Sequence, residues 1–188
     1  MKALMWHVSQ NILITHPVNI RYLTGVKLSL GRLLVTSTGM TLFVDSRYTE
    51  EVQNTVKKGV NIGSMHDLMK AVTRRRRCLF EGDHVTVMQL QRWKNSFPRT
   101  RFLPRSGLVE ALRRQKTRQE IRAMKKAECI TEEILRRIPS MFRHRPTERE
   151  LAWKLRAWTQ ELGADDFSFD PIVAFGKHTS HPHHHLTA

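Results

Sequence analysis

The residues best suited to chemistry are histidines gathered at the end of the chain. The segment HPHHHLTA places His181, His183, His184 and His185 within five positions. Imidazole binds transition metals and exchanges protons near neutral pH, so these residues suit a metal site or part of an active site. No cysteine or carboxylate lies beside them, and a structural metal site needs ligands in a fixed geometry. We therefore predict that the chain binds no metal here and that His178 is a loop residue.

Carboxylates elsewhere in the chain raise the same question. Asp165 and Asp166 follow an expected helix end, and Asp170 precedes a proline, where aspartate commonly begins a turn. We interpret all three as turn residues rather than cation ligands. In the sequence VDSRY, Asp45 and Arg47 are predicted to cap the following helix rather than to contact a substrate. A structural role is also favoured for Asn19, Arg21 and Tyr22.

The composition is that of a basic chain that can bury a core. Hydrophobic residues make up 40% of the 188 residues, and no apolar run reaches the roughly 18 residues of a membrane helix. The N-terminus MKALMWHVSQ lacks the apolar run of a signal peptide, and the two cysteines make no disulfide framework. We expect a cytoplasmic protein with no membrane partner.

The basic charge raises the question of a nucleic-acid partner. The chain has 32 Lys and Arg against 17 Asp and Glu, a formal net charge of +15 that can attract phosphates without specificity. The densest run, TRRRRCLF, has no interleaved aromatic residues that would stack on bases. We favour a solvated basic surface, and an acidic or nucleic-acid partner stays open as the alternative.

Strand and helix patterns alternate in the N-terminal part of the chain. Short apolar runs bounded by turn residues predict strands over residues 11–15, 32–37, 40–45, 78–82 and 100–104. Helices are predicted over residues 46–59, with Ser46 as the N-cap, and over 65–74 and 85–97. This alternation predicts a layered α/β domain with a mostly parallel sheet, which we place at residues 1–105.

A different pattern begins near Gly107, where the strand signals stop. Residues 108–138 carry apolar side chains at helical spacing on a charged background, with a break expected near Lys116 and Thr117. We place a second, mainly helical domain at residues 106–188.

The rest of this second domain contains one more helix and one strand candidate. Thr147 and Glu150 are spaced as a capping box, which predicts a helix that begins there and ends near Gly163. The segment DFSFDPIVAFG, residues 166–176, is apolar and β-branched, and we predict that it forms a strand.

Three segments in order carry a family resemblance. NIRYLTG at residues 19–25, with LFVDSRY at 42–48, is similar to the signature of one family's N-terminal domain. GLVEALRRQKTRQEIRAMKKA at 107–127 is similar to the helix that opens its catalytic domain. Residues 147–184 are similar to the next helix and the first strand, ending at a Pro-His pair. Together they resemble the creatinase and Xaa-Pro peptidase family, the pita-bread metallopeptidases that include aminopeptidase P and prolidase.

The resemblance implies a creatinase-type N-terminal α/β domain followed by an α+β pita-bread catalytic domain. It implies an Xaa-Pro aminopeptidase or dipeptidase, which hydrolyses the bond preceding proline in a peptide with proline at the second position. Family members use two divalent cations, commonly manganese, cobalt or zinc, to activate a water molecule. Their ligands, two Asp, one His and two Glu, are expected after the Pro-His pair. We therefore expect a truncated catalytic domain that binds neither cation and is inactive alone.

His183 takes the position of the family's Pro-His histidine, beside the scissile bond of the substrate. The resemblance gives it a catalytic role, as a donor to the substrate carbonyl or a stabiliser of the transition state. It assigns no substrate-binding residue. One alternative is a non-catalytic peptidase-like binding module with a basic surface. The other is an α/β domain with a poorly packed helical extension, whose unpaired apolar strand would favour a homodimer.

Overall fold

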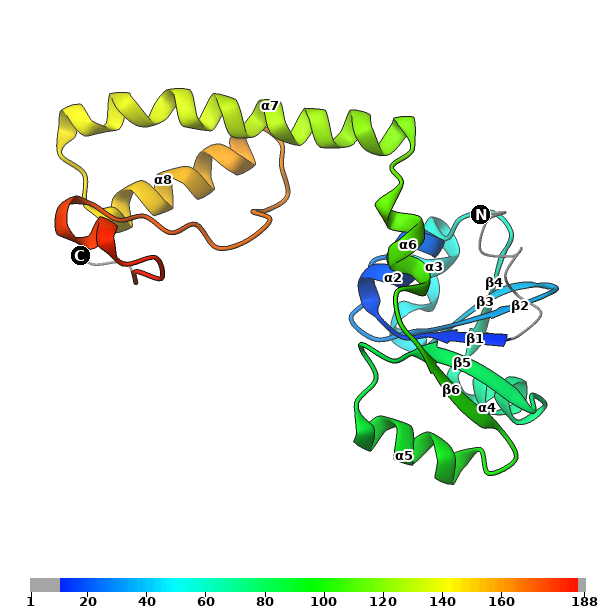
Figure 1. Cartoon of the computed structure of the whole chain (residues 1–188). Coiled ribbons are helices and arrows are strands. Elements are labelled where there is room, and N and C mark those ends of the chain that lie inside the picture. Colours follow the sequence, from blue (N-terminus) through cyan, green and yellow to red (C-terminus); the bar gives the residue numbers. More distant parts are fainter. Residues whose placement is uncertain (1–10, 186–188) are drawn as a thin grey trace. The chain divides into compact units, whose positions relative to one another are not determined.

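The computed structural model describes residues 11–185, and the chain divides into two compact units between Gln115 and Lys116 (Figure 1). We call these unit 1 and unit 2. The sequence placed the boundary near residue 105, whereas the structure adds helix α6 (Leu108–Arg114) to unit 1. The reason is that α6 packs on helix α2 (Pro17–Thr24). No helix among the residues described combines the length and apolarity needed to cross a membrane.

Unit 1 is an α/β domain built on one six-stranded sheet. The strands are β1 (Asn11–Ile14), β2 (Arg32–Thr36), β3 (Gly39–Val44), β4 (Val60–Ser64), β5 (Arg77–Glu81) and β6 (Arg101–Arg105). Their order in the sheet is β4-β3-β2-β1-β5-β6. Neighbours β1 and β5, β5 and β6, and β3 and β4 are parallel, while β2 is antiparallel to both β1 and β3. The predicted α/β class and mostly parallel sheet are confirmed.

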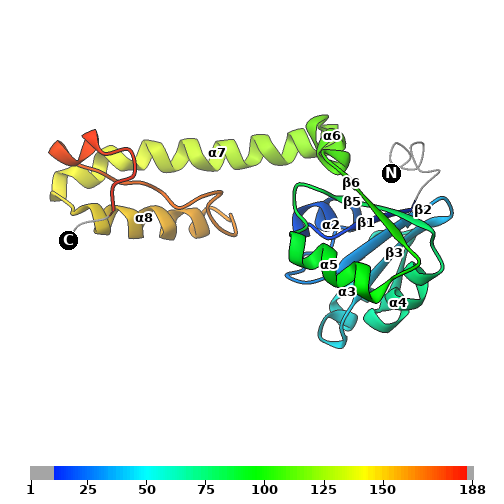
Figure 2. The ribbon, with the colours of Figure 1, turned by 60° about the horizontal axis from the view of Figure 1, so that its bottom comes forward.

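Helices cover both faces of this sheet (Figure 1 and Figure 2), and a buried cluster lies on each face. The covering helices are α2, α3 (Thr49–Thr55), α4 (Met65–Thr73), α5 (Val87–Ser96) and α6. Ile12 and Ile14 of β1 join a buried cluster with side chains of α2, α3 and α6. Leu13 joins a second cluster with side chains of α4 and α5. Because side chains alternate between the faces of a strand, β1 is buried on both sides, as an inner strand should be.

Cys78 of β5 lies in the second of these clusters and has no exposed surface. Burial raises the pKa of its thiol to about 12, so the thiol stays protonated near neutral pH. Cys78 is therefore a packing residue, as the absence of a paired metal motif in the sequence suggested.

The segment after β3 differs in detail from the sequence prediction. Asp45 caps a 3₁₀ turn, η1 (Ser46–Tyr48), which precedes α3, and its carboxylate accepts a hydrogen bond from the Arg47 backbone N–H at 3.0 Å. The prediction that Ser46 caps the helix was wrong, because α3 has Tyr48 at its N-cap position and no side-chain capping bond. Asp45 and Arg47 were predicted to cap this helix, but Asp45 caps η1 instead, and the Arg47 guanidinium pairs with the Asp45 carboxylate at 2.6 Å.

Unit 2 is built from two helices with shorter turns. Helix α7 (Arg118–Met141) packs against α8 (Glu148–Glu161), and the turns are η2 (Phe142–His144) and η3 (Gly176–Ser180). The predicted break near Lys116 and Thr117 is confirmed, because Thr117 forms a capping box that starts α7. Thr147 and Glu150 form the predicted capping box of α8. The buried hydrophobic side chains among the described residues of unit 2 are Ile134, Leu151, Trp158 and Val173.

The strand predicted over residues 166–176 does not form. The described part of unit 2 contains no strand, and residues 164–175 run without regular structure. A strand exists through hydrogen bonds to a neighbouring strand, and no such neighbour lies among the described residues of this unit. Val173 is buried, whereas Phe169 and Ile172 of the same segment are exposed.

Candidate functional site

The predicted catalytic residue, His183, lies exposed in a turn that follows η3. Two backbone hydrogen bonds wind this turn, from the His181 N–H to the His178 carbonyl at 3.0 Å and from the His184 N–H to the His181 carbonyl at 3.2 Å. The turn therefore presents the imidazole of His183 to solvent from a backbone that is held on both sides. An exposed imidazole on a fixed backbone can contact a bound peptide.

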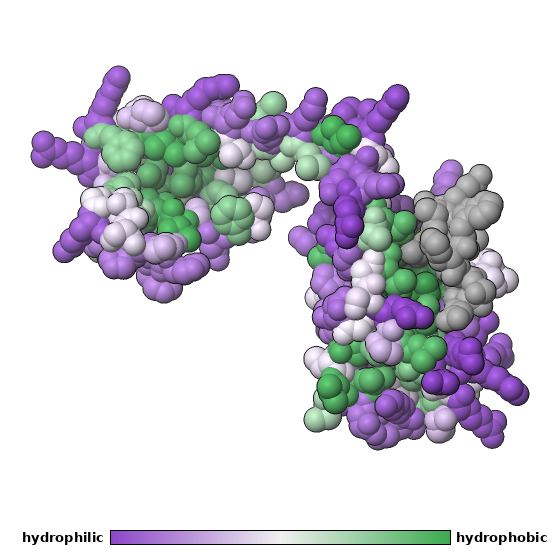
Figure 3. Space-filling view, viewed as in Figure 1, coloured by the Kyte–Doolittle hydropathy of each residue, from purple (hydrophilic) through white to green (hydrophobic). Residues whose placement is uncertain are grey.

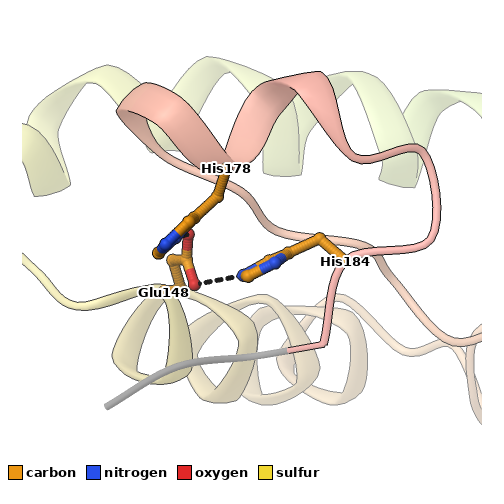
Figure 4. Close-up of side chains that lie close together, drawn as sticks. All are labelled: Glu148, His178 and His184. Atoms are coloured by element: carbon orange, nitrogen blue, oxygen red, sulfur yellow. Dashed lines mark hydrogen bonds and ion pairs between the residues drawn. The ribbon is translucent and has the colours of Figure 1, made fainter.

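Glu148, the first residue of α8, anchors the segment that leads to this turn. It is only 3% exposed. Its Oε1 accepts a hydrogen bond from the Phe175 backbone N–H at 2.8 Å and lies 2.9 Å from Nδ1 of His178. Its Oε2 lies 2.6 Å from Nε2 of His184 (Figure 4). One carboxylate thus binds three points of the segment 175–184.

The two imidazoles that contact Glu148 also stack on each other. The rings of His178 and His184 stack with their centroids 4.5 Å apart and an angle of 19° between their planes. His178 was predicted to be a loop residue, but it lies in the 3₁₀ turn η3 and its ring contacts Glu148 and His184. No carboxylate lies beside the histidines in the sequence, and the one that contacts them, Glu148, comes from 30 and 36 positions earlier in the chain.

The signal that would have found Glu148 is weak. It stands directly after Thr147 in the capping box, where an acidic residue is ordinarily explained by the helix N-terminus. Only tertiary structure turns this side chain inward, toward His178 and His184.

A groove lies along α8 and is lined by residues of unit 2 other than Glu148, His178 and His184. Arg149, Trp153 and Arg156 of α8 line it, together with Phe167, Asp170 and Pro171, around a cavity of about 780 Å³. Trp153 is 68% exposed, and apolar side chains gather on unit 2 in the space-filling view (Figure 3). The groove combines cationic and aromatic side chains on one surface.

The aspartates near this groove pair with arginine rather than with one another. Asp166 Oδ1 lies 3.2 Å from Arg156 and accepts a hydrogen bond from the Phe167 backbone N–H at 2.8 Å. Asp170 lies 3.7 Å from Arg156. Asp165 and Asp166 lie in a bend after the end of α8, which fits their interpretation as turn residues, and Asp170 lies in irregular backbone.

The polar residues of the N-terminal signature have a structural role in unit 1. Asn19 is fully buried, and its amide donates to Glu81 Oε1 at 2.7 Å and to Glu110 Oε1 at 2.6 Å. Arg113 donates to the Asn19 oxygen at 3.0 Å. Burial opposes the charged form of Glu110, but the hydrogen bond from Asn19 and the charge of Arg113 outweigh it and lower the pKa of Glu110. Asn19 therefore connects α2, β5 and α6, as the sequence interpretation proposed.

The described residues do not supply the dinuclear centre that the resemblance implies. Within residues 11–185, one group of three metal-binding side chains comes together, Glu148, His178 and His184, with ligand atoms within 4.8 Å of one another. This group has one carboxylate and two imidazoles. The ligand set that the resemblance implies for the dinuclear centre is four carboxylates and one imidazole, which this group does not match.

Both units match models of known protein families. The family model described as Creatinase/Prolidase N-terminal domain matches residues 7–115, and that of Metallopeptidase family M24 matches residues 122–188. The chain is 29% identical over 179 residues to "Uncharacterized peptidase YqhT" of Bacillus subtilis, covering 92% of the chain and 50% of the relative. The chain thus spans about half the length of the curated relatives it matches.

Solved structures also align with nearly all of this chain but with only part of their own length. An Xaa-Pro dipeptidase from Bacillus anthracis aligns with a TM-score of 0.79 and 26% identity, over 94% of this chain and 51% of that one. A prolidase from Pyrococcus furiosus aligns with a TM-score of 0.85 over 99% of this chain and 60% of that one. At 22% identity, the second likeness shows the fold alone.

Proposed function

Because the chain belongs to the creatinase and prolidase family of pita-bread metallopeptidases, we propose that its protein hydrolyses the peptide bond preceding proline. One observation carries this proposal. The two family matches follow each other over residues 7–115 and 122–188, and the second includes the turn that presents His183 to solvent. The solved Xaa-Pro dipeptidase aligned above supports the same chemistry.

In this proposal His183 is a catalytic residue that contacts the substrate beside the scissile bond. A neutral imidazole can donate a hydrogen bond to the substrate carbonyl. Glu148 is a positioning residue, since its bonds to Phe175 and His184 fix the backbone on both sides of η3. Fixed supports of this kind hold a catalytic group within the small tolerance that reaction geometry allows.

The proposal also covers what lies outside the described residues. The substrate is a peptide with proline at the second position, the metals of a complete catalytic domain are manganese, cobalt or zinc, and the location is the cytoplasm. Unit 2 exposes large apolar side chains, including Trp153 at 68% and Phe169 at 77%, which supports a catalytic domain with further segments packed on this unit. We propose that residues 1–188 by themselves lack peptidase activity.

The experiment compares two polypeptides from the same gene. One is the 188-residue chain, and the other is the product of the full reading frame that contains it. Each is assayed with the dipeptide Ala-Pro and with the tripeptide Ala-Pro-Ala in the presence of manganese, cobalt or zinc. We expect release of alanine by the full product and no release above buffer by the 188-residue chain. Hydrolysis by the 188-residue chain would place the catalytic metals within it, and a folded but inactive full product would contradict the peptidase function.

A further inference from the structure

The contacts of Glu148 with His178 and His184 have the features of a metal site. Each imidazole directs a ring nitrogen at a different oxygen of the same carboxylate, at 2.9 and 2.6 Å (Figure 4). The donor atoms of all three side chains lie within 4.8 Å of one another. Around a tetrahedral cation with bonds of 2.0–2.2 Å, neighbouring donor atoms are about 3.3 Å apart. Small side-chain rotations therefore suffice to place a cation among them.

We propose that Glu148, His178 and His184 form a binding site for one transition-metal cation of the zinc type. Two imidazole nitrogens and one carboxylate oxygen are ligands that such a cation accepts, and three protein ligands leave a fourth position open for water. Imidazole also disfavours magnesium and calcium, which select oxygen ligands. This proposal goes beyond peptide hydrolysis, and the family resemblance gives none of the three residues a role as metal ligand.

The site is held in place before any cation binds. Glu148 is 3% exposed, and the Phe175 backbone N–H donates to its Oε1 at 2.8 Å, which orients the carboxylate. The side chain of His184 is 10% exposed, and its ring stacks on that of His178. The side chain of His178 is 29% exposed, which gives a cation a path to the group from solvent.

Occupancy of the site would cross-link two parts of unit 2. Glu148 begins α8, whereas His178 lies in η3 and His184 directly follows His183 in the turn. A bound cation would tie this turn to the helix more strongly than hydrogen bonds alone. Because the cation binds the folded arrangement, it would also raise the thermal midpoint of the chain.

The test measures zinc binding by the untagged 188-residue chain after removal of metal with a chelator. We expect one zinc ion per chain in a calorimetric titration. The double variant H178Q/H184Q is expected to lose at least about 100-fold in affinity, since two of three ligands are removed. The matched control H181Q/H185Q removes two exposed histidines of the same segment and is expected to stay within about 3-fold of wild type.

Two further measurements keep the result interpretable if H178Q/H184Q unfolds. Cobalt(II) bound to the wild-type chain should show the strong visible absorption of a four-coordinate site. The variant Glu148→Gln keeps an acceptor for the Phe175 N–H while removing the charged ligand, and it should weaken both the absorption and zinc affinity. The site is disproved if wild type binds no zinc at micromolar concentrations. It is also disproved if E148Q binds zinc as tightly as wild type while H181Q/H185Q loses zinc affinity, because only the exposed histidines would then hold the ion. Because metal binding is the readout, failure here is independent of peptidase activity.

Discussion

Replacement of Glu81 by alanine is expected to destabilise unit 1 by about 3–5 kcal/mol, because several buried donors lose their acceptor at once. The Glu81 carboxylate accepts hydrogen bonds from the backbone N–H groups of Thr15 and His16 at 2.6 and 2.8 Å. It also accepts from the Asn19 amide at 2.7 Å. Glu81 is 5% exposed, so water cannot replace the missing acceptor without entering the core.

The measurement is amide hydrogen exchange of β1 and β5 as urea is raised, since these strands report unit 1 alone. Glu50→Ala is the matched control, because Glu50 is exposed on α3 and its loss should change the stability by less than about 0.5 kcal/mol. A Glu81→Ala variant within about 1 kcal/mol of wild type would show that this network does not hold α2 against the sheet.

Replacement of His183 by alanine in the full reading-frame product is expected to lower kcat for Xaa-Pro hydrolysis by about 10²- to 10⁴-fold, the contribution typical of a positioned acid or base. KM should change much less, because His183 is proposed to act on the reacting bond rather than on the whole peptide. Initial rates over a range of Ala-Pro-Ala concentrations separate the two parameters.

His181→Ala serves as the control, because His181 is also exposed in the same turn and is not proposed to contact substrate. Its kcat should match wild type. If His183→Ala keeps kcat within about 3-fold of wild type, the Pro-His position has no catalytic role in this protein.

The sequence predicted the parts of the fold that local periodicity controls. The strands around Leu13, Leu34 and Phe80 are continuous apolar runs, and they appear as β1, β2 and β5. It missed α2, a short helix, and β4, whose sequence VNIGS contains Asn and Gly, residues that are poor in strands. Both elements depend on tertiary packing against β1 and β3 more than on their own pattern.

The candidate site depends on tertiary packing even more than α2 and β4 do, so less of it could be predicted from the sequence. His183 was found because its position in a longer motif is local. The group of Glu148, His178 and His184 was missed, because Glu148 lies 30 and 36 positions before the two histidines and joins them only when η3 folds back on the start of α8. The residues 166–176 illustrate the reverse error, since an apolar run does not specify a strand without a neighbour to pair with.

Selectivity for proline tests the proposed function most directly. The full reading-frame product, loaded with manganese, is assayed with Ala-Pro and Ala-Pro-Ala and, at the same concentrations, with Ala-Ala and Ala-Ala-Ala. For at least one peptide length we expect kcat/KM to be about 100-fold or more higher for the peptide with proline at the second position. Equal values with and without proline, or no hydrolysis of any of the four peptides by the folded and metal-loaded protein, would contradict assignment of this chain to Xaa-Pro hydrolysis.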